Sequence, residues 1–179
     1  MHTSRIVWTI GKAASRALLR GKLADPRGTF SLSMRVWPNE ADLKFVNHAS
    51  YFVYFEAARW DAGLQCGFGN VLRSRQCSPI AGGQLIQYLR PMQRHDTFEV
   101  VTKILAVDER WWHFEHKVVR KGEVCTRAWV KVVMRNRTGV LAPQELLRLA
   151  GHTVELPNDV TRVDKLVKEL ATCGPSATQ

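Results

Sequence analysis

The amino-acid sequence lacks several features that would place it in a specialised class of proteins. No apolar run approaches the ~20 residues that cross a bilayer, so no membrane-spanning helix is expected. The four cysteines are scattered without a C-x-x-C pair, and no secretory signal precedes them. This favours reduced, mostly buried thiols in a cytoplasmic protein and argues against a zinc site. No acid occurs before Asp25 either, so the first segment carries positive charge alone.

The balance of charges is the compositional outlier. The formal net charge is +10 over 179 residues, and about half of this excess lies before Asp25. Such a balance favours an anionic partner, such as nucleic acid, a lipid head-group surface or a phosphorylated small molecule. Nucleic acid is not expected as a partner, because the aromatic residues sit in apolar runs rather than beside basic residues.

Residues 4–21 are predicted to form a basic amphipathic helix, because basic side chains recur every three to four positions with apolar residues between them. Three roles stay open for it: it lies on an anionic membrane surface, it is an organellar transit segment, or it covers the core of its own protein. A turn at 24–28 separates this helix from the rest of the chain. The chain therefore divides into residues 1–28 and a main domain of residues 29–179.

After this turn the pattern becomes mostly β. Val, Thr and aromatic residues alternate with other residues in five segments, and the short polar links between the last three predict antiparallel hairpins. Alternation puts Trp111 and Trp112 on opposite faces of one strand. A basic loop is expected at 73–75, and the last helix is expected to be capped by Asn158 or Asp159. The predicted strands are Thr29–Trp37, Ile80–Leu89, Phe98–Val107, Trp111–Arg120 and Val124–Arg135, and the predicted C-terminal helices are Pro143–Ala150 and Val160–Ala171.

A long helix between the first and second strands organises this pattern. It begins near His48 and carries apolar or aromatic residues nearly all round, which is typical of a helix buried inside a fold. One strand, one long helix and four consecutive strands predict an α+β architecture. The antiparallel sheet of about five strands wraps around one central helix, with extra helices at the N- and C-terminal ends. This is the hotdog fold.

An acid lies just before the predicted central helix. Asp42 precedes the polar segment Asn47–Ser50, and the unpaired N–H groups and macrodipole of a helix N-terminus favour negative charge there. A carbonyl held at this end would be polarised and open to attack by Asp42, or by a water that Asp42 orients. A plain capping role in the turn is the alternative for Asp42. Glu40, two residues earlier, is expected to be exposed.

The segment His48–Arg59, HASYFVYFEAAR, resembles the helix-opening motif of the 4-hydroxybenzoyl-CoA thioesterase-like branch of hotdog acyl-CoA thioesterases. In that branch an Asp lies a few residues before this motif. Asp42 takes that place, one residue closer to His48 than in the bacterial members. The similarity covers roughly residues 30–160 and extends to thioesterase superfamily member six and its bacterial relatives.

This resemblance implies an acyl-CoA thioester hydrolase that acts on fatty or aromatic acyl groups and needs no cofactor. It makes Asp42 the nucleophile or general base, while His48 either orients the thioester or is structural. Backbone N–H groups near the start of the helix would bind the oxyanion, and Asn47 either caps the helix or binds substrate. The remaining site residues are Ala49 and Ser50 for substrate positioning, Tyr51, Tyr54 and Phe55 for the acyl pocket, and Arg90, Arg94, Lys103 and Arg120 for the coenzyme A phosphates.

Hotdog proteins commonly place their site at a subunit interface, so the resemblance also implies a homodimer or homotetramer. Two other functions stay open. One is a non-catalytic hotdog protein that binds acyl chains, or an anionic membrane surface through the N-terminal helix. The other is a hotdog hydratase or dehydratase, which is less expected because those enzymes use a tighter Asp/His arrangement. The expected location is cytoplasmic, or peripheral on membranes.

Overall fold

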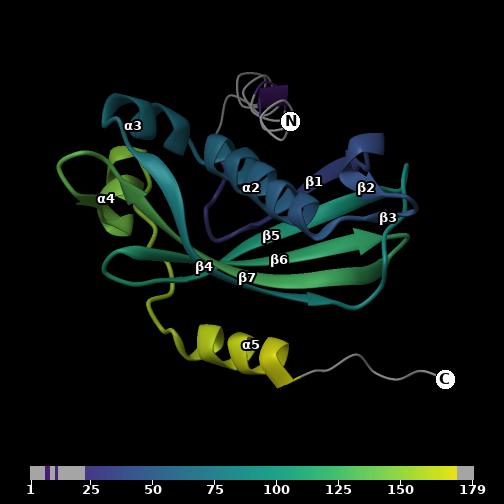
Figure 1. Cartoon of the computed structure of the whole chain (residues 1–179). Helices are drawn as coiled ribbons and strands as arrows, with labels where there is room; N and C mark the ends of the chain where they lie inside the picture. Colours follow the sequence, from purple (N-terminus) through teal and green to yellow (C-terminus); the bar gives the residue numbers. More distant parts are fainter. Residues whose placement is uncertain (1–6, 9–10, 12–22, 173–179) are drawn as a thin grey trace.

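The computed structural model describes residues 7–8, 11 and 23–172, and one antiparallel sheet forms its centre (Figure 1). All pairings in this sheet are antiparallel. The five expected strands are confirmed, with bounds that differ by at most two residues. In spatial order they are β1 (Thr29–Arg35), β5 (Thr97–Val107), β6 (Trp111–Arg120), β7 (Glu123–Arg135) and β4 (Ser78–Tyr88), and β8 (Val140–Leu141) pairs with β7.

Alternation along the strands gives the sheet two different faces. In β5, Phe98 and Val100 are buried, whereas Glu99 and Lys103 are exposed. Because successive side chains of a strand point to opposite sides, the buried set of every strand faces the same layer. Trp112 of β6 belongs to this buried set and is 0% exposed. The other face carries charged side chains joined by ion pairs, among them Glu115 with Lys117 and Arg127, and Arg127 with Glu169.

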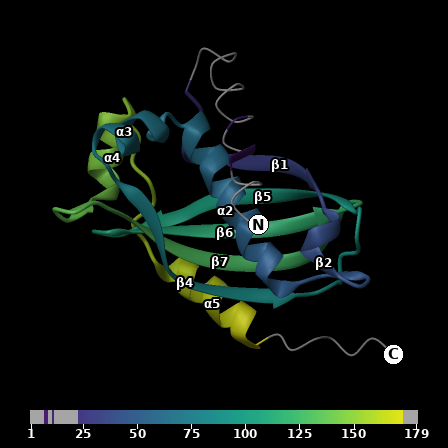
Figure 2. The same ribbon diagram turned by 45° about the horizontal axis from the view of Figure 1, so that its top comes forward.

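The buried face of the sheet wraps around α2 (His48–Gln65), the long central helix (Figures 1 and 2). Half of its 18 residues are buried, and Tyr54, Phe55 and Ala57 are fully enclosed. The helix begins where Asn47 caps it, since Asn47 Oδ1 accepts a hydrogen bond from the Ser50 N–H at 3.0 Å. One antiparallel sheet around one buried helix confirms the predicted hotdog fold.

Short elements complete the chain on either side of α2. Before the helix, the 3-10 helix η1 (Pro38–Glu40) leads into a hairpin of β2 (Ala41–Asp42) and β3 (Phe45–Val46). After it comes α3 (Phe68–Ser74). The basic loop expected at 73–75 is wrong in its first two positions, which complete α3. Gly69 and Asn70 are weak helix formers, so the residues of this segment do not predict a helix. The helix is seen only in the folded structure.

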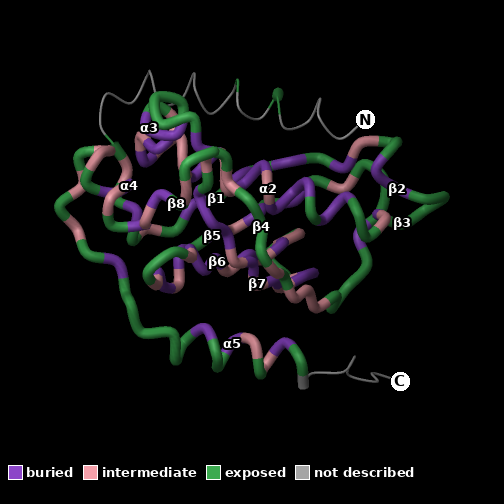
Figure 3. The backbone as a smooth tube through the Cα atoms, turned by 60° about the vertical axis from the view of Figure 1, so that its left-hand side comes forward, coloured by how far each residue is buried: buried purple, intermediate pink, exposed green. Residues whose placement is uncertain are grey.

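Two C-terminal helices, α4 (Pro143–Leu149) and α5 (Thr161–Thr172), confirm the prediction. Of the two expected caps for α5, Asp159 accepts the Thr161 N–H at 2.9 Å through Oδ1. The helix lies on the side of the sheet away from α2 (Figures 1 and 2) and contacts β4, β5 and β7. Its buried residues recur three or four positions apart, so buried and exposed segments alternate along it in Figure 3. They are Val163, Leu166 and Leu170.

The predicted basic helix at 4–21 and the roles considered for it fall almost wholly outside the described residues. Within the described part, the Trp8 ring meets the Trp37 ring edge-on, with 6.3 Å between centroids. The turn at 24–28 is present, because the Gly28 N–H donates to the Asp25 carbonyl at 2.9 Å. Of the helices that the structure describes, none has the length and apolar character needed to cross a membrane.

Candidate active site

The N-terminus of α2 is held by a compact polar arrangement. The Ser50 N–H and hydroxyl both donate to Asn47 Oδ1, at 3.0 and 2.9 Å, and the same hydroxyl lies 3.0 Å from the Glu40 carbonyl. The cap therefore already uses the Ser50 N–H. His48 and Ala49 are exposed, and their N–H groups come before the first intrahelical hydrogen bond. These two N–H groups are therefore the available donors at this end of the helix.

Asp42 lies on the β2–β3 hairpin, directly before this helix end. In the hairpin Asp42 pairs with Phe45 and Ala41 with Val46, so Leu43 and Lys44 form a tight turn. Leu43 adopts a φ of 52°, which is the left-handed conformation that a residue with a Cβ rarely takes. Asp42 is exposed. The loop that is one residue shorter than in the bacterial members thus closes as a strained two-residue turn and leaves the carboxylate accessible.

The hairpin is fixed on two sides by backbone hydrogen bonds. On one side the Asn47 N–H donates to the Glu40 carbonyl at 3.0 Å. On the other, the Val46 N–H donates to the Met92 carbonyl at 3.0 Å, and the Arg94 N–H donates to the Lys44 carbonyl at 3.1 Å. The position of Asp42 is therefore tied both to α2 and to the loop between β4 and β5.

Glu40 is buried, which corrects the expectation that it is exposed. Only 4% of its surface is accessible, and its Oε2 accepts hydrogen bonds from the Trp37 N–H at 2.8 Å and the Tyr54 hydroxyl at 3.0 Å. The acid thus links the segment before α2 to the second turn of α2. The available signal was an acid three residues after a helix-opening position, which is the capping-box pattern.

An aromatic wall borders the start of the helix. The His48 ring meets the Tyr88 ring edge-on at 4.9 Å, and Tyr51 meets Tyr88 at 5.1 Å. Tyr51 is 3% exposed, and burial raises the pKa of its hydroxyl. Tyr54 and Phe55 are completely enclosed in the core. Sequence reasoning missed Tyr88, because the end of a strand gives no indication of which helix it faces.

An apolar cavity lies elsewhere, beside the C-terminal half of α2. Its volume is about 130 Å³. It is enclosed by α2, α3 and the inner faces of the strands, and none of the three residues expected to form the acyl pocket lines it. The lining residues are Phe30, Glu56, Arg59, Trp60, Ala62, Gly63, Cys66, Phe68, Gly69, Leu72, Pro79, Ala81, Ile104, Trp112, Phe114, Val132 and Met134.

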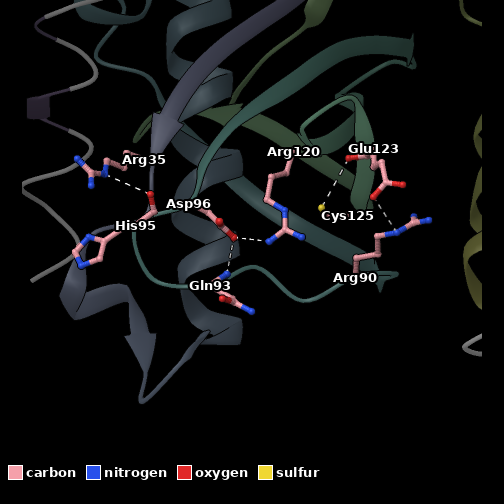
Figure 4. A network of polar contacts seen from close by, with 8 residues as sticks. All are labelled: Arg35, Arg90, Gln93, His95, Asp96, Arg120, Glu123 and Cys125. Atoms are coloured by element: carbon pink, nitrogen blue, oxygen red, sulfur yellow. Dashed lines mark hydrogen bonds and ion pairs between the residues drawn. The ribbon is translucent and has the colours of Figure 1, made fainter.

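Three of the four basic residues expected at the coenzyme A phosphates lie in the β4–β5 loop or are bonded to it, and Figure 4 shows two of them, Arg90 and Arg120. Arg120 Nη1 donates to Asp96 Oδ2 at 2.5 Å, and this hydrogen bond raises the pKa of Arg120. Arg90 Nε lies 3.4 Å from Glu123 Oε2. Arg94 is exposed, and its backbone N–H is bonded to the hairpin. The fourth residue, Lys103, alternates with the buried residues of β5 and therefore lies on the opposite face of the sheet.

One antiparallel sheet around a buried central helix is the fold that the resemblance to hotdog thioesterases implies. Residues 36–163 match the model of the thioesterase-like superfamily. The chain belongs to this superfamily, which confirms the family inferred from the helix-opening motif.

Individual relatives agree with this assignment. Protein THEM6 from Danio rerio is 27% identical over 116 residues, which are 63% of this chain and 55% of THEM6, so the chain spans about half the length of that relative. A hypothetical protein from Aquifex aeolicus has a TM-score of 0.62 and 25% identity, covering 68% of this chain and 98% of its own. A 1,4-dihydroxy-2-naphthoyl-CoA thioesterase from Synechocystis has a TM-score of 0.57 and 14% identity, covering 69% and 95%. This last likeness concerns the fold alone.

Proposed function

We propose that the protein hydrolyses acyl-CoA thioesters at the N-terminus of α2, with Asp42 as the reacting carboxylate. The observation that carries the proposal is the exposed Asp42 on a hairpin bonded to the helix start. Asp42 either attacks the thioester carbonyl, forming an anhydride that water then opens, or activates a water for direct attack. In both routes coenzyme A leaves as the thiol and the acyl group leaves as the free acid. Membership of the thioesterase-like superfamily supports this function.

The oxyanion that forms on the carbonyl needs donors at the helix end. We assign this role to the backbone N–H groups of His48 and Ala49, where the helix dipole adds to their effect. Asn47 and Ser50 are positioning residues, because the hydrogen bonds between them hold the first turn of α2 in place. The His48 ring, packed against Tyr88, forms part of the wall beside the reacting group.

The phosphates of coenzyme A are proposed to bind beside the hairpin. Arg94 is the first candidate, because it is exposed and its backbone is bonded to the hairpin that carries Asp42. Arg90 and Arg120 would have to exchange their carboxylate partners, Glu123 and Asp96, for a phosphate. Lys103 belongs to the other face of the sheet and would not reach a phosphate bound here.

A homodimer joined along β4 fits this site. β4 is the last strand in the sheet order, and its outer edge pairs with no strand in the described part of the chain. Ile80 and Tyr88 of this strand are 47% and 38% exposed. Pairing of two β4 edges would protect them and bring the wall of Tyr88 and His48 to the interface. Analytical ultracentrifugation measures the mass, and a monomer at micromolar concentration would contradict the dimer.

Hydrolysis of a panel of acyl-CoAs tests the function. The panel contains short, long and aromatic acyl groups, and the proteins are the wild type, Asp42→Asn and the control Asp164→Asn, which changes an exposed acid on α5. We expect Asp42→Asn to lower kcat by at least about 100-fold, the usual contribution of a positioned base, and the control to match the wild type. An inactive wild type would refute the hydrolase. Equal activity of Asp42→Asn and wild type would refute the role of Asp42 alone.

A further inference from the structure

The cavity beside the C-terminal half of α2 is separate from the proposed active site. Its lining residues on α2 begin at Glu56 and end at Gly63, whereas Asp42 lies before the first turn. At 1.5 Å per residue, the twelve positions from Asn47 to Arg59 span about 18 Å. A ligand of the cavity therefore does not touch the residues proposed for hydrolysis.

Arg59 brings a positive charge into this apolar space. Its Nη1 lies 3.3 Å from His116 Nε2, and within the described residues its guanidinium has no other hydrogen-bond partner. Burial lowers the pKa of Arg59 to about 10. Glu56 also lines the cavity, but it acts on Arg59 only through its charge and makes no hydrogen bond to it. Most of the donors on the guanidinium therefore remain available.

His116 cannot neutralise this charge. A guanidinium only donates, so His116 Nε2 must be the acceptor, and Nδ1 then carries the proton and donates to Thr102 Oγ1 at 2.9 Å. The ring is 0% exposed and stacks on Phe55 with 5.0 Å between centroids. Burial and the neighbouring Arg59 hold the pKa of His116 well below 6.5. The imidazole is therefore neutral and fixed in one tautomer.

Trp112 also lines the cavity. The residue is 0% exposed, and its indole N–H is enclosed by the surrounding atoms. Trp112 therefore contributes its aromatic ring to the wall rather than a donor. Aromatic side chains make up much of the remaining wall, namely Phe30, Trp60, Phe68 and Phe114.

We propose that this cavity binds a small aromatic carboxylic acid, with the carboxylate on Arg59 and the ring among the aromatic walls near Trp112. The cavity has room for the aromatic ring, since an engineered cavity of about 150 Å³ binds benzene and this one measures about 130 Å³. The carboxylate would lie outside the ring space, at the half-buried Arg59. Entry is beside Arg59 and Trp60, which are half-buried, whereas Trp112 is fully enclosed. Glu56 opposes binding, because it places a second negative charge beside the carboxylate.

Benzoate and its neutral isostere benzamide test this site on the full-length protein by calorimetric titration. We expect benzoate to bind at least tenfold more tightly than benzamide, Arg59→Met to weaken benzoate at least tenfold, and Glu56→Gln to strengthen it several-fold. The indole N–H resonance of Trp112 should shift on addition of benzoate. Equal affinities for the two probes, or an unshifted Trp112 resonance, would overturn the proposal even if Arg59→Met failed to fold.

The Asp42→Asn variant separates this inference from the proposed function. It should bind benzoate with unchanged affinity, because Asp42 lies at the other end of α2. Loss of benzoate binding in this variant would show that the probe occupies the hydrolytic site and would overturn the proposal. If the wild-type protein binds benzoate but hydrolyses no acyl-CoA, the cavity assignment stands and the proposed hydrolase function is refuted.

Discussion

Replacing Glu40 with alanine tests how the start of α2 is held. The carboxylate accepts hydrogen bonds from the Trp37 N–H at 2.8 Å and the Tyr54 hydroxyl at 3.0 Å, and Glu40 is 4% exposed. Glu40→Ala removes this acceptor from the buried Tyr54 hydroxyl and the partly buried Trp37 N–H, and each lost hydrogen bond costs about 1–3 kcal/mol. The free energy of unfolding should therefore fall by about 2–6 kcal/mol. At 2–4 °C per kcal/mol for a chain of this size, Tm should fall by roughly 4–24 °C.

Urea denaturation of a double-mutant cycle measures this effect. The cycle contains Glu40→Ala, Tyr54→Phe and the double variant, and Glu109→Ala is the control because Glu109 is exposed. The coupling between Glu40 and Tyr54 should be about 1–2 kcal/mol, since each substitution removes the same hydrogen bond. The hydrolysis rate should fall along with stability, because the Glu40 side chain ties the segment that leads into the Asp42 hairpin to α2. A loss below 1 kcal/mol, or full additivity, would refute the bracing role.

Leu43→Gly should raise the free energy of unfolding by about 0.5–1 kcal/mol in urea denaturation, because Leu43 is 94% exposed and its φ of 52° suits glycine; lower stability would contradict this. Gly82→Ala should lower it by about 1–3 kcal/mol, because the new Cβ would lie 2.3 Å from the Trp111 ring; an unchanged urea midpoint would contradict the close contact. Stability should also fall as the pH drops below 6.5, because burial holds the pKa of His116 well below that value and only the unfolded chain takes up the proton. The limiting slope is about 1.4 kcal/mol per pH unit, and His116→Gln should flatten the curve between about pH 6.5 and 5.

The sheet and the central helix could be predicted because long elements repeat their pattern many times. The first ten residues of β5 alternate between buried and more exposed positions, so this strand could be predicted without knowledge of its neighbours. The same alternation puts Trp111 and Trp112 on opposite faces of one strand. The central helix was predicted from a different signal. Its surface is apolar nearly all round, and a surrounding sheet can bury such a surface.

Details of the site depend on contacts that no local pattern contains. β2 and β3 have two residues each, too few for any periodicity, so the hairpin under Asp42 emerged only from the structure. The burial of Glu40 could not be predicted, because its partner Tyr54 lies 14 positions away along the chain. The cavity is formed where α2, α3 and the sheet fail to fill the space between them, and packing defects of this kind leave no trace in the sequence.

The hydrogen bonds between the hairpin and the β4–β5 loop have a mechanical consequence. Val46 and Lys44 on the hairpin are bonded to Met92 and Arg94 on the loop, so the two segments form one rigid unit. A phosphate that pulls on Arg94 therefore pulls on the peptide two residues from Asp42. Binding of the nucleotide end of a substrate would then also position Asp42 relative to the thioester. Substitutions that loosen the β4–β5 loop should therefore lower kcat as well as the affinity for the substrate.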